Sequence, residues 1–140
     1  MIRADVATKK IARATAWLDS AAALLAHPAS ELRVADTTRD LGAFHFFLAV
    51  QEAIDLAAHW VADAGWTPPD DIGSTFDVLA AHGVITGDLA DTMRTVVRVR
   101  NRIAHGYASI DAERLHDEAP AGIAAIRTFL VLVAGQAAKE

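Results

Sequence analysis

The 140-residue chain contains no cysteine, few aromatic side chains (6%) and no apolar run long enough to cross a bilayer. Without cysteine, disulfides and thiolate metal sites are excluded. The longest apolar stretches, near Phe44 to Val50 and Thr128 to Ala134, fall well short of the roughly 18 residues that a spanning helix needs. The first ten residues carry charges with no apolar segment behind them, so no secretory signal is expected. These absences favour a soluble cytoplasmic protein with no membrane partner.

Positive charge is also scarce, because 13 Lys and Arg residues stand against 18 Asp and Glu residues, for a net charge of −5. Extensive nucleic-acid binding depends on neutralising phosphates, so this balance argues against a general nucleic-acid coat protein. The exception is local, since four of the 13 basic side chains lie within nine residues: Arg94, Arg98, Arg100 and Arg102. Any anion-binding surface is therefore confined to this segment.

Apolar residues make up 53% of the chain and charged residues 22%, which is typical of one globular domain spanning residues 1–140. Alanine is abundant and apolar residues recur every three or four positions, so the pattern predicts an all-α fold. We expect an antiparallel bundle of four main helices plus a short one. The predicted helices cover about Asp5 to His27, Asp36 or Thr37 to Ala64, Ser74 to Ala81, Thr86 or Asp88 to the His105–Gly106 pair, and a helix capped by Asp111 that runs to about Ala137.

Local signals set the predicted helix ends. Pro28 stops the first helix, Gly65 terminates the second, and Pro120 bends or splits the last. The second helix is apolar almost all the way round. One side carries Leu41, Phe44, Leu48 and Asp55, and much of another carries Phe46, Phe47, Val50, Ile54 and Val61. In so small a domain, one side can face the core, and a second copy of the chain is the best partner for the other. The alternative is a central helix wrapped on all sides within one bundle.

The helix that carries the arginines has a clear apolar side, formed by Leu89, Met93, Val96, Val99, Ile103 and Tyr107. Arg94, Arg98, Arg102 and His105 lie roughly opposite, where solvent is expected. Arg100 breaks this pattern because it falls among the apolar positions. A half-buried guanidinium stays charged and requires an anionic partner. Asp55, near Gln51 and His59, could form a structural pair with Arg100; the functional alternative is that Arg100 lines a cleft and binds phosphate.

His105 lies about 140° from Arg100 on a continued helix, too divergent to share a site easily. The following Gly106 predicts that the helix ends there in a left-handed cap, so that His105 can turn toward Arg100 of the same or a partner subunit. The alternative is that His105 is a simple partner of the helix dipole. Spacing alone leaves both interpretations open.

The stretch from Arg100 to Tyr107 reads RNRIAHGY and fits an R-X4-H-X-Y signature. It resembles the HEPN superfamily, in particular HepT-like toxins, and the resemblance extends from about residue 40 to 112. The resemblance implies a ribonuclease toxin that acts as a homodimer, with the two motifs facing a shared cleft. It also implies a minimal nucleotidyltransferase as antitoxin, which silences the toxin by attaching AMP to Tyr107.

The residues of the motif suit RNA cleavage without metal. His105 can transfer protons near neutral pH, and Arg100 can hold a phosphate with two parallel hydrogen bonds. Asn101 could orient the phosphate or the histidine, with Arg102 in support, and Arg94, Arg98 and Arg102 could track the RNA strand. The expected products are a 2′,3′-cyclic phosphate and a 5′-hydroxyl.

No cofactor or metal site is expected, because the other histidines are scattered and none forms an H-x-x-x-H or H-E-x-x-H pair. Two other functions remain open. The chain could be a non-catalytic helical partner or regulatory subunit of a nucleotidyltransferase, in which Arg100 and His105 are interface or nucleotide contacts. It could also be a structural dimerisation module in which both residues are replaceable.

Overall fold

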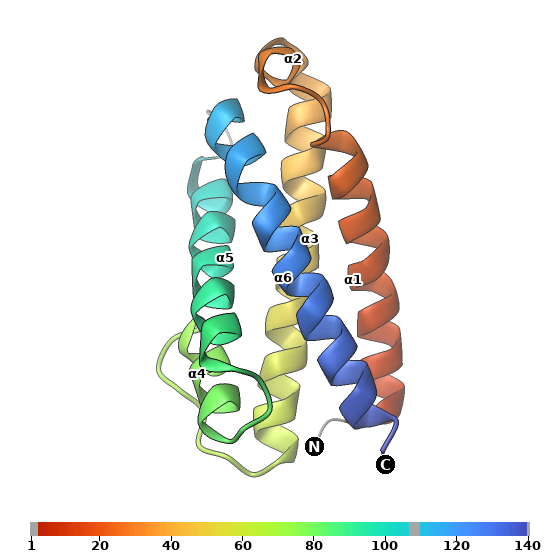
Figure 1. Cartoon of the computed structure of the whole chain (residues 1–140), viewed down its shortest axis with the longest axis vertical. Coiled ribbons are helices and arrows are strands. Elements are labelled where there is room, and N and C mark those ends of the chain that lie inside the picture. Colours follow the sequence, from red (N-terminus) through yellow and green to blue (C-terminus); the bar gives the residue numbers. More distant parts are fainter. Residues whose placement is uncertain (1–2, 107–109, 140) are drawn as a thin grey trace.

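The structure is a computed structural model that describes residues 3–106 and 110–139. These residues form α-helices and connecting loops, without a strand: α1 (Ala4–Leu24), α2 (Ala29–Val34), α3 (Asp36–Asp63), α4 (Ser74–Ala81), α5 (Gly87–Gly106) and α6 (Ala112–Ala137). The four long helices, α1, α3, α5 and α6, run side by side, with α2 at one end and α4 beside the start of α5 (Figure 1). The start of α1 and the end of α6 share the end of the bundle that lies opposite α2. The predicted all-α bundle is confirmed.

The sequence prediction missed one element, α2. The first helix ends at Leu24 rather than near His27, and a separate six-residue helix follows Pro28. Proline is well suited to the start of a helix, because its fixed φ matches the first turn and its missing N–H is not needed there. Pro28 therefore caps the start of α2, which begins at Ala29, and the buried side chain of Leu32 anchors this short helix to the bundle.

The other predicted helix ends are close to the observed ones. Gly65 and Gly83 follow α3 and α4 with φ of +75°, the left-handed conformation that favours glycine. The hydroxyl of Thr86 accepts the backbone N–H of the third residue beyond it at 3.1 Å, and the Asp111 carboxylate does the same for α6. Pro120 does not split the last helix, which is continuous from Ala112 to Ala137.

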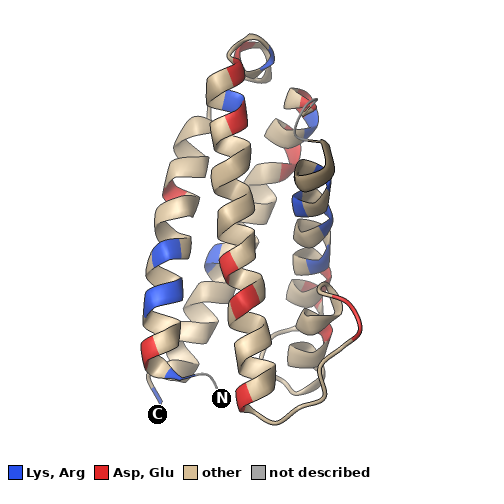
Figure 2. Ribbon diagram, turned by 180° about the vertical axis from the view of Figure 1, so that it is seen from behind, with Lys and Arg blue, Asp and Glu red and all other residues tan. Residues whose placement is uncertain are grey.

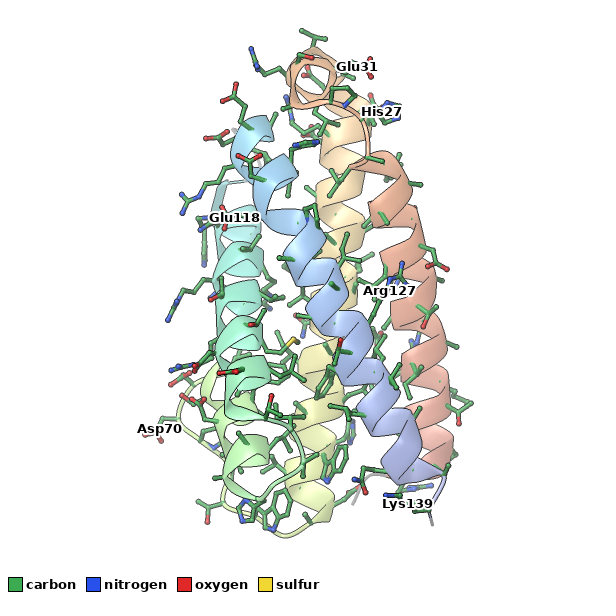
Figure 3. All side chains as sticks on the ribbon, viewed as in Figure 1. His27, Glu31, Asp70, Glu118, Arg127 and Lys139 are labelled. Atoms are coloured by element: carbon green, nitrogen blue, oxygen red, sulfur yellow. The ribbon has the colours of Figure 1, made fainter. Side chains whose placement is uncertain are left out.

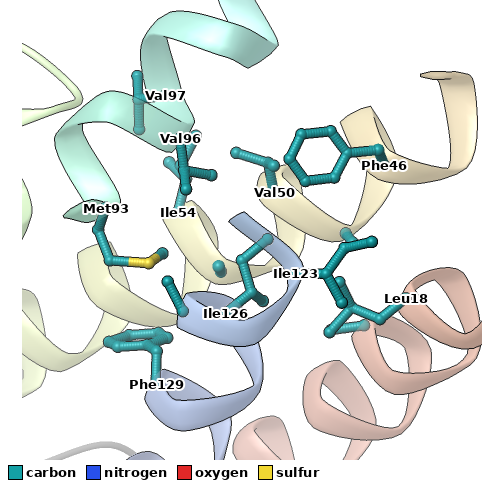
Figure 4. Packing of buried hydrophobic residues seen from close by; sticks show 14 of the residues in the cluster. Leu18, Phe46, Val50, Ile54, Met93, Val96, Val97, Ile123, Ile126 and Phe129 are labelled. Carbon is teal, nitrogen blue, oxygen red and sulfur yellow. The ribbon is translucent and has the colours of Figure 1, made fainter. Parts of the chain in front are cut away.

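The core surrounds α3, which packs against each of the other five helices. Figure 4 shows side chains of α1, α3, α5 and α6 meeting there, among them Leu18, Phe46, Val50, Ile54, Met93, Val96, Ile123, Ile126 and Phe129. Gly122 of α6 brings α6 close to α3, because a Cβ at this position would lie 2.9 Å from Cζ of Phe46. This close approach fixes how α6, and therefore the α5–α6 pair, sits on the central helix.

One side of α3 is only partly covered. Phe46 is fully buried, but Phe44 is 53% exposed and Leu41 is 42% exposed. The central helix is therefore not wrapped on all sides within one chain. By length and composition α3 and α6 could cross a membrane, but 50% and 44% of their most apolar windows are buried inside the bundle. About half of each apolar window is thus packed into the core.

Candidate functional site

Helix α5 separates its apolar and basic side chains as predicted, except at Arg94, which is half-buried rather than exposed. Met93, Val96, Val99 and Ile103 are buried against the bundle, and Leu89 is half-buried. The side chains of Arg98, Arg102 and His105 are exposed, and Figure 2 shows basic residues following one another along α5. The end of α5 thus carries the candidate residues on a helix that the core holds firmly.

Arg100 is half-buried between α5 and α3, and neutral groups surround it. Its Nη2 donates to Oε1 of Gln51 at 2.7 Å, and its Nη1 donates to Oδ1 of Asn101 at 2.7 Å. The guanidinium carbon lies 5.1 Å from the centre of the Phe47 ring, a distance at which a cation is attracted to the aromatic face. Among the described residues no carboxylate pairs with this guanidinium, and its buried Nε has no hydrogen-bond partner. The arginine is therefore positioned but not neutralised.

The hypothesis of an Arg100–Asp55 pair is wrong. The Asp55 carboxylate lies 3.4 Å from Nζ of Lys10 on α1, and the same ammonium lies 3.3 Å from Glu52. Glu52 and Asp55 of α3 thus face α1, whereas Gln51 reaches α5. The residue that sequence reasoning missed is Gln51, an uncharged acceptor that fixes Arg100 without neutralising its charge.

His105 is exposed on the last turn of α5. The prediction of a left-handed cap at Gly106 is wrong, because α5 continues through Gly106 and the glycines with positive φ in the described residues are Gly65 and Gly83. His105 therefore keeps the helical direction, about 140° around the axis from Arg100. Asn101 lies between them: it accepts a hydrogen bond from Arg100 and sits one helical turn before His105 on the same face.

The other arginines of α5 differ in what they bind. Arg94 pairs with Asp91 at 2.6 Å and with Asp77 at 3.5 Å, and the hydrogen bond to Asp91 is the main reason that the pKa of Arg94 is raised. Arg102 donates from Nη2 to both carboxylate oxygens of Glu118 at 2.7 Å. Arg98 has no ion pair among the described residues. Of the three predicted strand-tracking arginines, Arg98 is the one left without a carboxylate.

Three pockets border the basic end of α5. The first, about 420 Å³, lies between α5 and α6 and includes His105, Arg102 and Arg114. The second, about 580 Å³, faces the loop before α4 and includes Arg98 and Asn101. A third, about 390 Å³, lies beside α3 and is lined by Phe44, Phe47, Ile103 and Ala104, among others. The predicted modification site, Tyr107, lies outside the described residues, and no group of three His, Asp or Glu side chains within those residues is arranged to hold a metal ion.

This fold and motif define the class of protein. A family model described as "Ribonuclease HepT-like" matches residues 14–133, and the chain belongs to the HepT-like family. The chain is similar in fold to a tri-AMPylated HEPN toxin of Shewanella oneidensis in complex with MNT antitoxin, with a TM-score of 0.84 and 19% identity over 94% of this chain and 98% of that one.

Two other solved structures have comparable folds. A toxin–antitoxin complex with AMP-PNP aligns with a TM-score of 0.82 and 18% identity over 92% of this chain and 98% of that one. A MntA–HpeT toxin–antitoxin mutant, in which a tyrosine is replaced by alanine, aligns with a TM-score of 0.83 and 18% identity over 93% and 98% of the two chains. No curated protein matches the chain in sequence.

Proposed function

We propose that this chain is the toxin of a cytoplasmic toxin–antitoxin pair and a metal-independent endoribonuclease. The observation that carries this proposal is Arg100, a half-buried cation held by the neutral groups of Gln51, Asn101 and Phe47 at the start of the R-X4-H motif. A structural arginine at such a position is expected to pair with a carboxylate, whereas one that binds phosphate must keep its charge. Membership of a family described as ribonuclease supports the same chemistry.

The proposed reaction uses the nucleophile that RNA itself supplies. The 2′-oxygen attacks the adjacent phosphorus, its proton leaves to a base, and the bond from phosphorus to the 5′-oxygen breaks as that oxygen takes up a proton. An imidazole titrates near neutral pH and can accept the first proton or deliver the second, which is the role of His105. Arg100 stabilises the charge that builds on the phosphate oxygens, and Asn101 keeps the guanidinium in place. The products are a 2′,3′-cyclic phosphate and a 5′-hydroxyl.

A single chain directs Arg100 and His105 to different sides of α5, so we infer that the working site forms in a homodimer. The exposed side chains of Leu41 and Phe44, together with the largely apolar pocket beside Phe47 and Ala104, supply a face that a second copy can cover. This face adjoins Arg100 through the Phe47 ring. Covering it brings the motif of each protomer to the same interface, where Arg100 can act with His105 of the partner subunit.

The proposed regulation is the attachment of AMP to Tyr107 by a nucleotidyltransferase antitoxin. It is supported by the position of Tyr107 two residues after His105, and by the AMPylated toxin among the similar solved structures. An added AMP brings a negative phosphate and a bulky base next to the motif, so charge repulsion and occlusion both oppose RNA binding. Mass spectrometry of toxin co-expressed with its antitoxin tests this, because Tyr107→Phe should abolish the added mass.

The decisive experiment compares RNA cleavage in EDTA by the wild type and by the Arg100→Ala and His105→Ala variants. Removal of a proton-transfer group or of a charge-stabilising group typically costs about 100-fold or more in rate. His59→Ala, which removes another exposed histidine from α3, is the matched control and should cut normally. Circular dichroism shows whether each variant is folded. Wild-type cleavage by either motif variant would reject this mechanism, and unfolding of Arg100→Ala would favour a structural role.

The second candidate is a non-catalytic partner of a nucleotidyltransferase. The net charge of −5, and the carboxylates that hold Arg94, favour it by limiting the charge available for RNA. Under this alternative the purified wild type binds the nucleotidyltransferase tightly and leaves RNA intact. Cleavage of RNA that disappears in His105→Ala would rule it out.

A further inference from the structure

The pocket between the end of α5 and the start of α6 combines an apolar floor with charged edges. Buried side chains of Val99, Ile103 and Leu115 form the floor, together with the half-buried Ile110. The exposed side chains of Arg102, Arg114, His105 and Asp111 stand around it. With a volume of about 420 Å³, the pocket is large enough for a small organic ligand.

The two arginines of this pocket are held by one carboxylate. Glu118 accepts from Nη2 of Arg102 at 2.7 Å and from Nε of Arg114 at 2.7 Å. Figure 3 shows Glu118 on the side of α6 that faces α5. The hydrogen bond from Arg102 is the largest of the effects that lower the pKa of Glu118, so the carboxylate stays ionised and keeps its hold at neutral pH.

This arrangement leaves N–H groups available for a ligand. Among the described residues, Arg102 makes no further hydrogen bond from Nε or Nη1, and Arg114 makes none from Nη1 or Nη2. A guanidinium fixed at one edge loses less freedom when its other edge binds a phosphate. Of the described residues that line the pocket, Asp111 is the one acidic side chain, and it accepts the backbone N–H of Arg114 at 3.1 Å as the cap of α6. Its second oxygen can accept from an amino group of a base.

Apolar floor, phosphate donors and a single acceptor together fit one class of ligand, a nucleotide of an RNA strand. We propose that this pocket binds the nucleotide that adjoins the scissile phosphate, with Arg114 of α6 as a ligand of its phosphate. The proposal rests on the proposed ribonuclease function, because His105 at the pocket edge connects the bound strand to the cleaved bond. Arg114 lies outside the R-X4-H motif and sets where the strand runs after it passes His105.

The test measures how tightly a single-stranded 2′-O-methyl oligoribonucleotide, which cannot be cleaved, binds to the purified protein across a series of salt concentrations. Arg114→Gln should weaken binding about tenfold, the loss of one charge-assisted contact. It should also reduce the salt slope by about 0.7, the value for one phosphate contact on a single strand. Arg114→Lys should regain the slope and only part of the affinity, because it keeps the charge and loses the fork.

The matched control is Arg127→Gln, which removes an arginine from the same helix. Arg127 pairs with Asp19 of α1 at 2.9 Å and lies on the other side of α6 in Figure 3. The Arg127→Gln variant should bind the oligomer as tightly as the wild type does. Equal affinities and equal salt slopes for Arg114→Gln and Arg127→Gln would overturn the proposed subsite.

Cleavage kinetics separate this proposal from the ribonuclease proposal. If the wild type cuts RNA, Arg114→Gln should raise KM about tenfold with kcat unchanged for a long substrate, because the contact holds the strand and not the reacting atoms. An unchanged KM would overturn the subsite while the ribonuclease stands. If the wild type cuts nothing but Arg114→Gln still weakens oligomer binding selectively, the subsite stands and the ribonuclease fails. A wild type that does not bind the oligomer would overturn the subsite.

Discussion

Replacing Gln51 by glutamate tests whether the charge of Arg100 is used. The amide oxygen of Gln51 accepts from Arg100 at 2.7 Å, and a glutamate of nearly the same shape would place a carboxylate there. The guanidinium has no carboxylate partner among the described residues of the wild type. Gln51→Glu would therefore convert a positioned cation into half of an ion pair with little change of volume.

The expected loss of cleavage rate in Gln51→Glu follows from Coulomb's law. Two unit charges about 4 Å apart attract by about 4 kcal/mol at an effective dielectric constant of about 20. Arg100 is only half-buried, so solvent screens part of this attraction. We assign about 1–3 kcal/mol of lost transition-state stabilisation, which corresponds to a cleavage rate about 5- to 150-fold lower. The same ion pair should leave the fold as stable as the wild type or raise its free energy of unfolding by up to about 1 kcal/mol.

The assay is single-turnover cleavage of a short RNA, measured with thermal unfolding of the same preparations. Gln51→Met is the companion variant, because it removes the acceptor without adding charge. It should slow cleavage only a few-fold, since Asn101 and the Phe47 ring still hold the guanidinium. A Gln51→Glu protein that is folded and cuts at the wild-type rate would refute the reasoning, because the charge of Arg100 would then have no part in the reaction.

Three further outcomes are expected. Gly122→Ala should destabilise the fold by about 1–3 kcal/mol, because the added Cβ would overlap the buried ring of Phe46. Gly135→Ala should stabilise the fold by about 0.5–1 kcal/mol, because no atom lies within 4 Å of the added Cβ. Urea unfolding measures both changes. Glu118→Gln should lower the free energy of unfolding at neutral pH by about 1 kcal/mol or less. The pKa of Glu118 is lowered chiefly by the hydrogen bond from Arg102. The stability that Glu118 contributes is therefore present above the ordinary glutamate pKa and is lost as the pH falls through the lowered pKa. The difference in unfolding free energy between wild type and variant should close in acid. Phe44→Glu should shift the molecular mass measured by light scattering toward that of a monomer. The control Val131→Glu, which changes an exposed side chain of α6, should leave the mass unchanged. A dimer that survives Phe44→Glu would contradict the proposed interface.

Much of the fold could be predicted from the sequence, because its strongest signals are local. The helix period, the glycines at 65 and 83, and the caps at Thr86 and Asp111 are all properties of a few adjacent residues, and they set the observed helix ends. Helix α2 escaped prediction because six residues are too few to show a helical period, and because proline is compatible with both the end of one helix and the start of the next.

The candidate site was less predictable, because the partner of a charged side chain depends on how helices are placed. The helix period identified Arg100 as the arginine among apolar positions, which the structure confirms. The period could not distinguish Asp55 from Gln51 as its partner, since both lie on the same part of α3 and the position of Lys10 on α1 decides between them. Glycine at position 106 likewise permits a left-handed cap without requiring one.

The direction of α5 has a practical consequence for handling this protein. Its 20 residues carry the chain about 30 Å, from the end of the bundle where α1 starts and α6 stops to the end where His105 stands (Figure 1). An affinity tag or a fluorescent domain joined before α1 or after α6 is therefore expected at the end of the bundle opposite the motif. Carrier proteins fused before α1 or after α6 should leave RNA cleavage equally fast, so the protein can be immobilised through either fusion.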